Sequence, residues 1–243
     1  GCSEGNVVVN LKPNSITGVA NQTGPANSSP SSTVLIDRGP PTVSLTAPST
    51  PNKNPLNFTL TSTEVLYDLT TSDFTVSGTG CTVSSVSGSS SPYTVQVTGC
   101  ANAASVYLTL VAAGVRDVAN NTAPPVSIST SASAVVMDTV LPTATWTSPA
   151  SPLNISNPTF TLTASEAISA LTSSNFTVSG TGCSLGTISV NALVTTVPLV
   201  GCSNGAAAKV TLNANALVDL AGNVAPASPL ASATISIDTQ APT

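Results

Sequence analysis

The sequence predicts an all-β chain of tandem β-sandwich domains in an extended array, on the basis of its residue types and an internal repeat. Val and Thr, which favour strands, are abundant among the 243 residues, and Pro, Gly and Asn, which favour turns, recur between them. No window is rich in the Leu, Glu, Lys and Arg that a long helix needs. Apolar and polar residues alternate in runs such as 105–111, which is typical of a strand with one buried face.

The repeat consists of segments that recur about 100 residues apart, which is the signature of repeated domains. Phe58-Thr59-Leu60-Thr61 returns as Phe160-Thr161-Leu162-Thr163. The other matching pairs are Glu64 and Glu166, Leu69 and Leu171, residues 74–81 and 176–183, Gly99-Cys100 and Gly201-Cys202, and Asp117-Val118-Ala119 and Asp219-Leu220-Ala221.

A closing Asp-Thr…Pro-Thr pattern sets the predicted domain boundaries. It occurs at 138–143 and at 238–243, and Asp37…Pro41-Thr42 is the same junction. Because Gly1-Cys2 matches Gly99-Cys100, we expect residues 1–37 to be the C-terminal third of a preceding repeat. Residues 38–138 and 139–238 are then two full repeats, and 239–243 begin the next one. We expect the parent protein to extend in both directions.

Each full repeat fits an immunoglobulin-like sandwich, since such domains have about 100 residues and seven short strands. Runs of strand-forming residues separated by turn residues support this reading. In the first full repeat we expect strands A to G at 42–47, 56–62, 73–77, 81–86, 92–98, 105–111 and 128–137.

Composition argues against catalysis, nucleic-acid binding and membrane insertion. Charged residues make up 6% of the chain, His is absent, and no P-loop, GxSxG or CxxC motif occurs. Five basic residues and a net charge of −5 leave no basic patch for phosphates. No apolar run approaches the roughly 18 residues of a membrane span. We therefore expect a non-catalytic protein with no nucleic-acid partner and no membrane span in this sequence.

The cysteines indicate one disulfide in each full repeat. Cys81 and Cys100 have the same spacing as Cys183 and Cys202, so pairing within repeats is the simplest arrangement, with buried free thiols as the alternative. Disulfides imply an oxidising, extracellular compartment. We expect the partner of Cys2 to lie upstream, in the missing part of the earlier repeat; an intermolecular disulfide is the rival reading.

Acidic residues at repeat-equivalent positions predict metal sites at the domain junctions. In a sandwich of this topology the entry linker, the B–C loop and the F–G loop meet at one pole, with the disulfide at the other. This groups the carboxylates as Asp37, Glu64 and Asp117 at one junction and as Asp138, Glu166 and Asp219 at the next.

The chemistry of these groups favours calcium. Three carboxylates in one place repel one another unless a cation joins them, and oxygen-only ligands favour a hard cation such as Ca²⁺. Asn121 and Asn223 are expected to add a side-chain or carbonyl oxygen. The alternative is turn chemistry, in which Asp and Asn form Asx turns and Glu64 caps amides or pairs with Arg116. Gly18 takes the aspartate position in the truncated repeat, which makes an ion there doubtful.

Several motifs together resemble the bacterial Ig-like repeats of large surface adhesins and cell-surface fibre proteins. They are Pro41-Thr42-Val43, Thr63-Glu64-Val65, Leu69…Ser72-Asp73-Phe74-Thr75-Val76, Asp219-Leu220-Ala221-Gly222-Asn223 and Asp238-Thr239-Gln240-Ala241-Pro242-Thr243. The resemblance covers nearly the whole chain. It implies stalk domains of the bacterial cell surface, some of them stiffened by calcium at the junctions. Two features depart from the family pattern: Glu is not followed by Pro, and a Cys pair is present.

We therefore expect a structural spacer of an extracellular stalk or fibre, whose partners are neighbouring repeats of the same polypeptide. One alternative is a self-assembling filament subunit, in which other copies of the chain are partners. Another is a module that binds glycans or proteins through its loops. A sugar site needs exposed aromatics, and we expect Trp146 to pack in the core or at the junction, which leaves Tyr67 and Asp68 as surface candidates.

Overall fold

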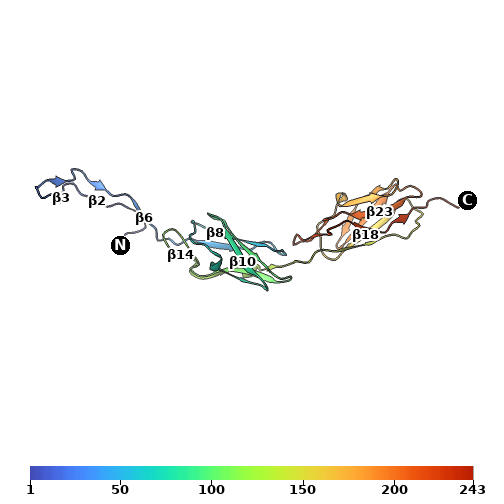
Figure 1. Cartoon of the computed structure of the whole chain (residues 1–243), viewed down its shortest axis with the longest axis horizontal. Helices are drawn as coiled ribbons and strands as arrows, with labels where there is room; N and C mark the ends of the chain where they lie inside the picture. The colour runs from blue at the N-terminus through green and yellow to red at the C-terminus, as the bar shows by residue number, and fades with distance from the viewer. Residues whose placement is uncertain (243) are drawn as a thin grey trace.

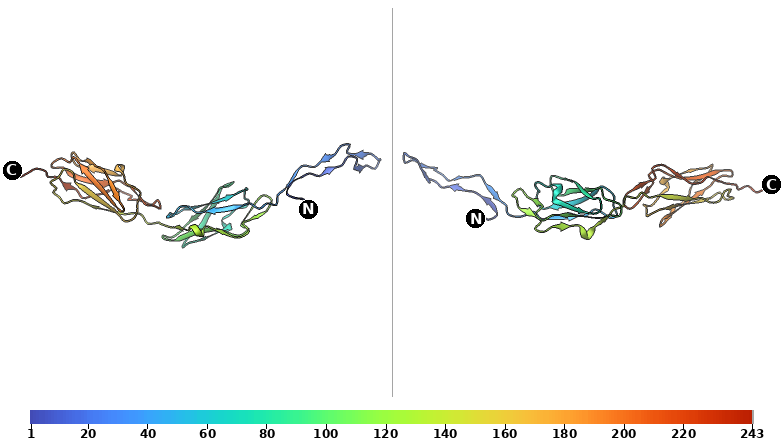
Figure 2. Two further views of the ribbon diagram at one scale, coloured as in Figure 1. Left: turned by 180° about the vertical axis from the view of Figure 1, so that it is seen from behind. Right: turned by 60° about the horizontal axis from the view of Figure 1, so that its bottom comes forward.

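A computed structural model describes residues 1–242, and its regular structure is almost entirely antiparallel β-sheet (Figure 1). An N-terminal hairpin and two sandwiches follow one another along an extended molecule (Figure 2). No helix in this range is both long and apolar enough to cross a membrane. The helical segments described are single 3-10 turns: η1 (Thr71–Asp73), η2 (Ser131–Ser133) and η3 (Ser173–Asn175).

The first sandwich packs two sheets around one core. One sheet has the order β10-β11-β8-β7, and in the other β12 lies between β9 and the pair β15 and β16. Alternation directs Leu56, Phe58 and Leu60 of β8 into the core, where each is fully buried. The strands are β7 (Val43–Thr46), β8 (Leu56–Ser62), β9 (Phe74–Ser77), β10 (Thr82–Ser87), β11 (Tyr93–Thr98), β12 (Ser105–Leu110), β15 (Ile128–Ser129) and β16 (Val135–Val136).

Six of the seven strands predicted in this sandwich are confirmed to within two residues at each end. The seventh, expected at 128–137, was wrong: η2 divides it into β15 and β16. The Leu108 amide donates to the Thr130 hydroxyl (3.0 Å), while the Thr130 amide donates to the Leu108 carbonyl (2.9 Å). Thr130 thereby takes over part of the backbone pairing and lets the chain turn away from the sheet. A short hairpin of β13 (Val115–Arg116) and β14 (Thr122–Ala123) was not predicted.

The second sandwich repeats this arrangement around its own core. One sheet has the order β17-β18-β22-β20, with β21 also on β22, and β23 lies between β19 and the pair β26 and β27. Trp146 of β17 packs edge-on against Phe160 and Phe176 and donates from Nε1 to the Leu230 carbonyl (2.9 Å). The strands are β17 (Ala144–Thr147), β18 (Thr159–Ala164), β19 (Phe176–Ser179), β20 (Ser184–Leu185), β21 (Ser189–Asn191), β22 (Val194–Val200), β23 (Ala207–Leu212), β24 (Leu217–Val218), β25 (Val224–Ala225), β26 (Leu230–Ala231) and β27 (Ile235–Ser236).

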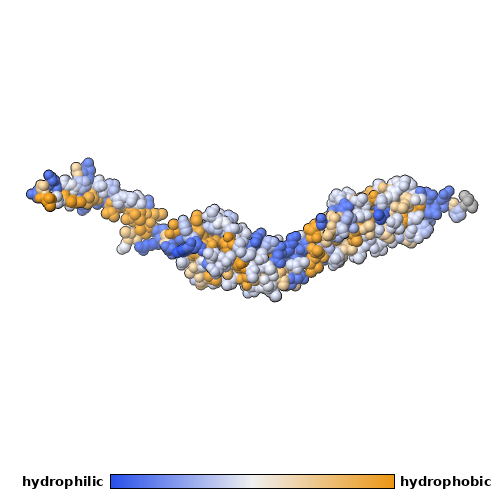
Figure 3. Space-filling model, in the orientation of Figure 1, coloured by the Kyte–Doolittle hydropathy of each residue, from blue (hydrophilic) through white to orange (hydrophobic). Residues whose placement is uncertain are grey.

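Residues 5–36 form a long hairpin. Its two arms pair with each other in the same way as the two arms of the segment from β12 to β16 in the first sandwich. In both, an amide donates to a hydroxyl of the opposite strand, Val9 to Ser31 in the hairpin. Its apolar face is open: Val9 is 69% and Ile16 56% exposed (Figure 3). The strands are β1 (Gly5–Val7), β2 (Asn10–Leu11), β3 (Ile16–Thr17), β4 (Thr23–Gly24), β5 (Ser29–Pro30) and β6 (Val34–Ile36).

Each sandwich contains one disulfide, Cys81–Cys100 in the first and Cys183–Cys202 in the second. The two segments that carry Cys81 and Cys100 approach closely because glycine precedes each cysteine. A Cβ on Gly80, which has φ +76°, would lie 2.7 Å from the Gly99 carbonyl oxygen. The two bonds indicate an oxidising environment. Cys2 is free and exposed.

Candidate metal sites at the domain junctions

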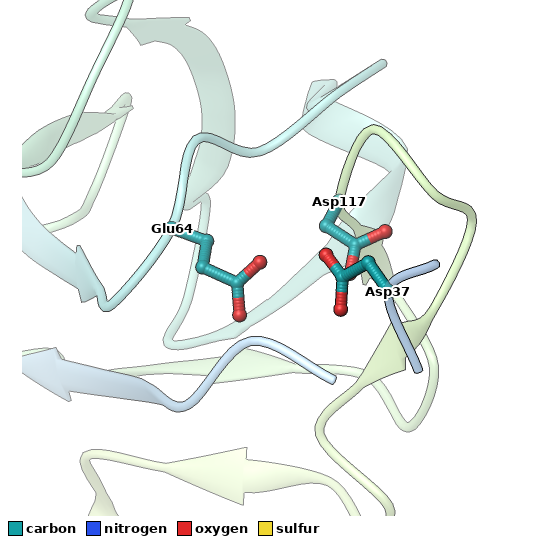
Figure 4. A group of neighbouring side chains, drawn as sticks. All are labelled: Asp37, Glu64 and Asp117. Atoms are coloured by element: carbon teal, nitrogen blue, oxygen red, sulfur yellow. The ribbon is translucent and has the colours of Figure 1, made fainter. Parts of the chain in front are cut away.

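Two groups of three carboxylates lie where a linker enters a sandwich. In the first, single oxygens of Asp37, Glu64 and Asp117 all lie within 4.8 Å of one another, and the side chains point into the same space (Figure 4). In the second group the same holds for Asp138, Glu166 and Asp219. The predicted carboxylates are therefore brought together at both junctions.

Local backbone pairing brings the glutamate loop to the aspartate loop. The Tyr67 amide donates to the Arg116 carbonyl (2.8 Å), which joins the segment after β8 to β13. In the second sandwich the Ser169 amide donates to the Val218 carbonyl (2.7 Å) and joins the segment after β18 to β24. Each glutamate is thus placed beside a carboxylate that is distant in sequence.

The loop aspartates are buried and held by the asparagine four residues later. Asp117 is 1% exposed and accepts from the Asn121 amide (2.9 Å) and from its Nδ2 (2.8 Å). Asp219, 3% exposed, accepts from Asn223 in the same way at 2.8 Å each. The turn chemistry proposed as an alternative is present in both loops. Each asparagine donates hydrogen bonds that orient the aspartate. The role of the asparagines as metal ligands stays a prediction.

The linker aspartates occupy turns of their own. Asp37 Oδ1 accepts from the Gly39 amide and Asp138 Oδ1 from the Val140 amide, both at 3.0 Å. At the second junction Asn223 Nδ2 also donates to the Asp138 carbonyl (2.9 Å). One asparagine therefore contacts both the loop aspartate and the linker backbone.

The two glutamates have raised pKa values because burial disfavours their charge and the other carboxylates of their groups repel it. Burial, and then the charges of Asp37, Asp117 and Glu4, raise the pKa of Glu64. Burial, and then Asp138 and Asp219, raise the pKa of Glu166. The contribution of Glu4 was not predictable from the repeat, because Glu4 has no acidic counterpart in the other repeats.

Asp117 shows the opposite balance. Burial raises its pKa, but the hydrogen bonds from the side chain of Asn121 and from loop amides outweigh burial and hold the pKa below its ordinary value. The lowered pKa keeps Asp117 ionised, as a metal ligand must be. An added cation would favour the ionised form of the neighbouring Glu64, whose pKa is raised.

The cationic side chains near the junctions do not pair with these carboxylates. Arg116 forms an ion pair with Asp68 and donates to Asn120 (2.7 Å), so its proposed pairing with Glu64 was wrong. Lys53 donates to the Gly222 carbonyl. The hydrogen bonds described within residues 1–242 include the Glu64 amide, which donates to Ser62, but none to the carboxylate of either glutamate. Each group thus offers oxygen ligands with uncompensated negative charge, which fits a hard divalent cation such as Ca²⁺.

Replacing Glu166 by Gln tests this electrostatic cost. A raised folded-state pKa contributes stability that is fully present below the ordinary value of 4.5 and is lost as the pH rises through the folded-state pKa. In chelator we therefore expect acidification from pH 7 to stabilise the second sandwich less in Glu166→Gln than in the unmodified chain, and the variant to melt higher at pH 7. Melting curves against pH measure this, and equal slopes would contradict it.

The third copy of the loop lacks the acid. The Gly18 amide donates to the Gln22 carbonyl (2.8 Å), as the Asp117 amide does to the Asn121 carbonyl (3.1 Å), so the turn is kept without its carboxylate. No group of three potential ligands is formed by the described part of this hairpin.

Comparison with known proteins adds no assignment: no family model matches the chain, and no curated protein matches it.

Proposed function

We propose that the two sandwiches are immunoglobulin-like domains in tandem. The sheets β7-β8-β11-β10 and β9-β12-β15/β16 follow the order A-B-E-D and C-F-G of a constant-type domain. We assign residues 38–138 and 139–238 to these domains. The hairpin of residues 1–37 corresponds to strands F and G of a further domain, because its exposed Val9 and Ile16 match the buried Leu108 and Val115.

We infer that the chain is a non-catalytic spacer of an extracellular stalk or fibre at a bacterial cell surface. The observation that carries this proposal is the recurrence of one carboxylate group at two successive linkers. A group built from a linker and two loops acts on the angle at which one domain follows another. The disulfides fit this role, since they stabilise domains with few aromatic core residues.

Calcium is the proposed ligand at both junctions. One ion bound to Asp138, Glu166 and Asp219 ties the linker to two loops of the following domain, and Asp37, Glu64 and Asp117 do the same at the first junction. Extracellular calcium modules bind at about 10⁻⁴–10⁻³ M. At the calcium concentrations outside a cell, both joints are then restrained.

Calorimetric titration of the full chain with CaCl₂ tests this function. We expect two ions per chain, one ion in Asp219→Asn, and none when Asp117→Asn is added. Asp73→Asn, at an acid outside both groups, is the matched control and keeps two. Absence of binding up to about 10 mM, well above the range of extracellular modules, would contradict the calcium role.

A self-assembling filament is the second candidate, and the one-sided pairing of the outer strands β7 and β10 favours it. Edge strands of this kind can pair with another copy of the chain. A filament subunit shows scattering mass that rises with concentration, and a lone spacer shows no such rise. Glycan binding has weaker support, because Trp146 is engaged in core packing.

A further inference from the structure

The second junction contains a direct contact between the two sandwiches that involves no carboxylate. Lys53, in the segment between β7 and β8, donates from Nζ to the carbonyl of Gly222, in the loop between β24 and β25. The two residues belong to different sandwiches. This ammonium therefore contacts the same loop that supplies Asp219.

The base of Lys53 is fixed to the first sandwich. Asn52 bridges to Met137 in parallel, its amide donates to the Val136 carbonyl (3.1 Å), and its carbonyl accepts from the Asp138 amide (2.8 Å). The Lys53 amide donates to Asn52 Oδ1 (2.8 Å). Lys53 thus extends from a segment that is paired with the outgoing linker, and only its side chain spans the junction.

The receiving loop turns at a glycine. Gly222 has φ +84°, a conformation that favours glycine, and Nζ of Lys53 would lie 3.7 Å from a Cβ at this position. The equivalent residue of the first sandwich, Asn120, bonds to Arg116 within its own domain instead. The second sandwich has Asn154 at the position of Lys53. The residue types at both equivalent positions therefore differ from those of this contact.

We propose that Lys53 is an interdomain clamp that fixes the orientation of the second sandwich on the first without a metal ion. The proposal rests on the spacer role above, since a spacer needs defined angles. The ammonium and the Asn223–Asp138 hydrogen bond hold the β24–β25 loop at two points, on the first sandwich and on the linker. A joint held in this way keeps its angle when calcium is removed.

Residual dipolar couplings of the full chain test the clamp in the presence of chelator. We expect both sandwiches to share one alignment tensor in the unmodified chain and to lose it in Lys53→Met, which keeps the aliphatic stem and removes the donor. Lys53→Arg, which retains a donor, keeps the shared tensor, as does Lys209→Met, a lysine on β23 that is not at the junction.

Each outcome separates the clamp from the calcium proposal. Shared tensors in Lys53→Met, or independent tensors in the unmodified chain, overturn the clamp whatever the calorimetry shows. A loss specific to Lys53→Met in a chain that binds no calcium supports the clamp and removes the calcium role. Melting temperatures of both sandwiches are expected to stay unchanged in Lys53→Met, and a fall in either would attribute the loss to unfolding and overturn the assignment.

Discussion

Replacing Cys183 and Cys202 together by Ala is expected to lower the free energy of unfolding of the second sandwich by about 3 kcal/mol. The bond closes a segment with a sequence separation of 19. It joins the start of β20 to the segment between β22 and β23, at the end of the sandwich near the outgoing linker. Without it the unfolded chain gains freedom, while the other core residues, which are Leu, Val, Ala, Ile and Phe, are kept.

Trp146 makes this effect measurable on one domain. It is the only Trp of the chain and packs on Phe160 and Phe176, so its emission reports unfolding of the second sandwich alone. One kcal/mol shifts the melting temperature of a domain of this size by about 4–8 °C, so a fall of more than about 10 °C is expected.

The matched control is the same double substitution at Cys81 and Cys100. It removes the disulfide of the first sandwich, which has a separate core, and it is expected to leave the Trp146 transition unchanged. A fall below about 1 kcal/mol in the second sandwich would show that the bond constrains little. Transfer of the effect from the first disulfide to Trp146 would show that the two domains unfold as one unit.

Strands were predictable from sequence where burial alternates and less so where a side chain replaces backbone pairing. β8 has the predicted bounds because Leu56, Phe58 and Leu60 form an unbroken alternation. The prediction of the last strand was wrong because the Thr130 hydroxyl accepts a hydrogen bond from the Leu108 amide. The sequence does not show whether a threonine in a strand will do this. The β13–β14 hairpin was missed because two paired residues on each side are too short for a periodic pattern.

The carboxylate groups were predictable because topology alone brings a linker and two loops to one pole. The orientation of individual polar groups was not. Asn121 and Asn223 proved to be donors to aspartate, a choice that depends on the rotation of an amide. Arg116 proved to pair with Asp68 instead of Glu64, which depends on side-chain reach. The contact of Lys53 was not predictable either, since its partner Gly222 lies in the next sandwich.

Addition of calcium in chelator-free buffer is expected to stabilise the second sandwich by about 2.7 kcal/mol once the ion reaches roughly one hundred times its dissociation constant. The ion binds the folded group and has no comparable site in the unfolded chain, because Asp138, Glu166 and Asp219 come from three separate segments. The rise in melting temperature followed through Trp146 is then of the order of 10 °C. Magnesium is expected to raise it less, since it requires a smaller, regular shell and retains water.

Three substitutions give this experiment its direction. Asp219→Asn is expected to abolish the calcium-dependent shift seen by Trp146, while Asp117→Asn, the equivalent change in the first sandwich, leaves it intact. Glu166→Gln is expected to raise the melting temperature in chelator and to lower the calcium shift, because the same carboxylate that repels its neighbours is the one that an ion would join. If the acids served only turns and caps, Glu166→Gln would not raise the melting temperature in chelator while lowering the calcium shift, and calcium would have no effect. If all three chains melt alike with and without calcium, the acids serve only their loops, and the angles between domains depend on contacts such as that of Lys53.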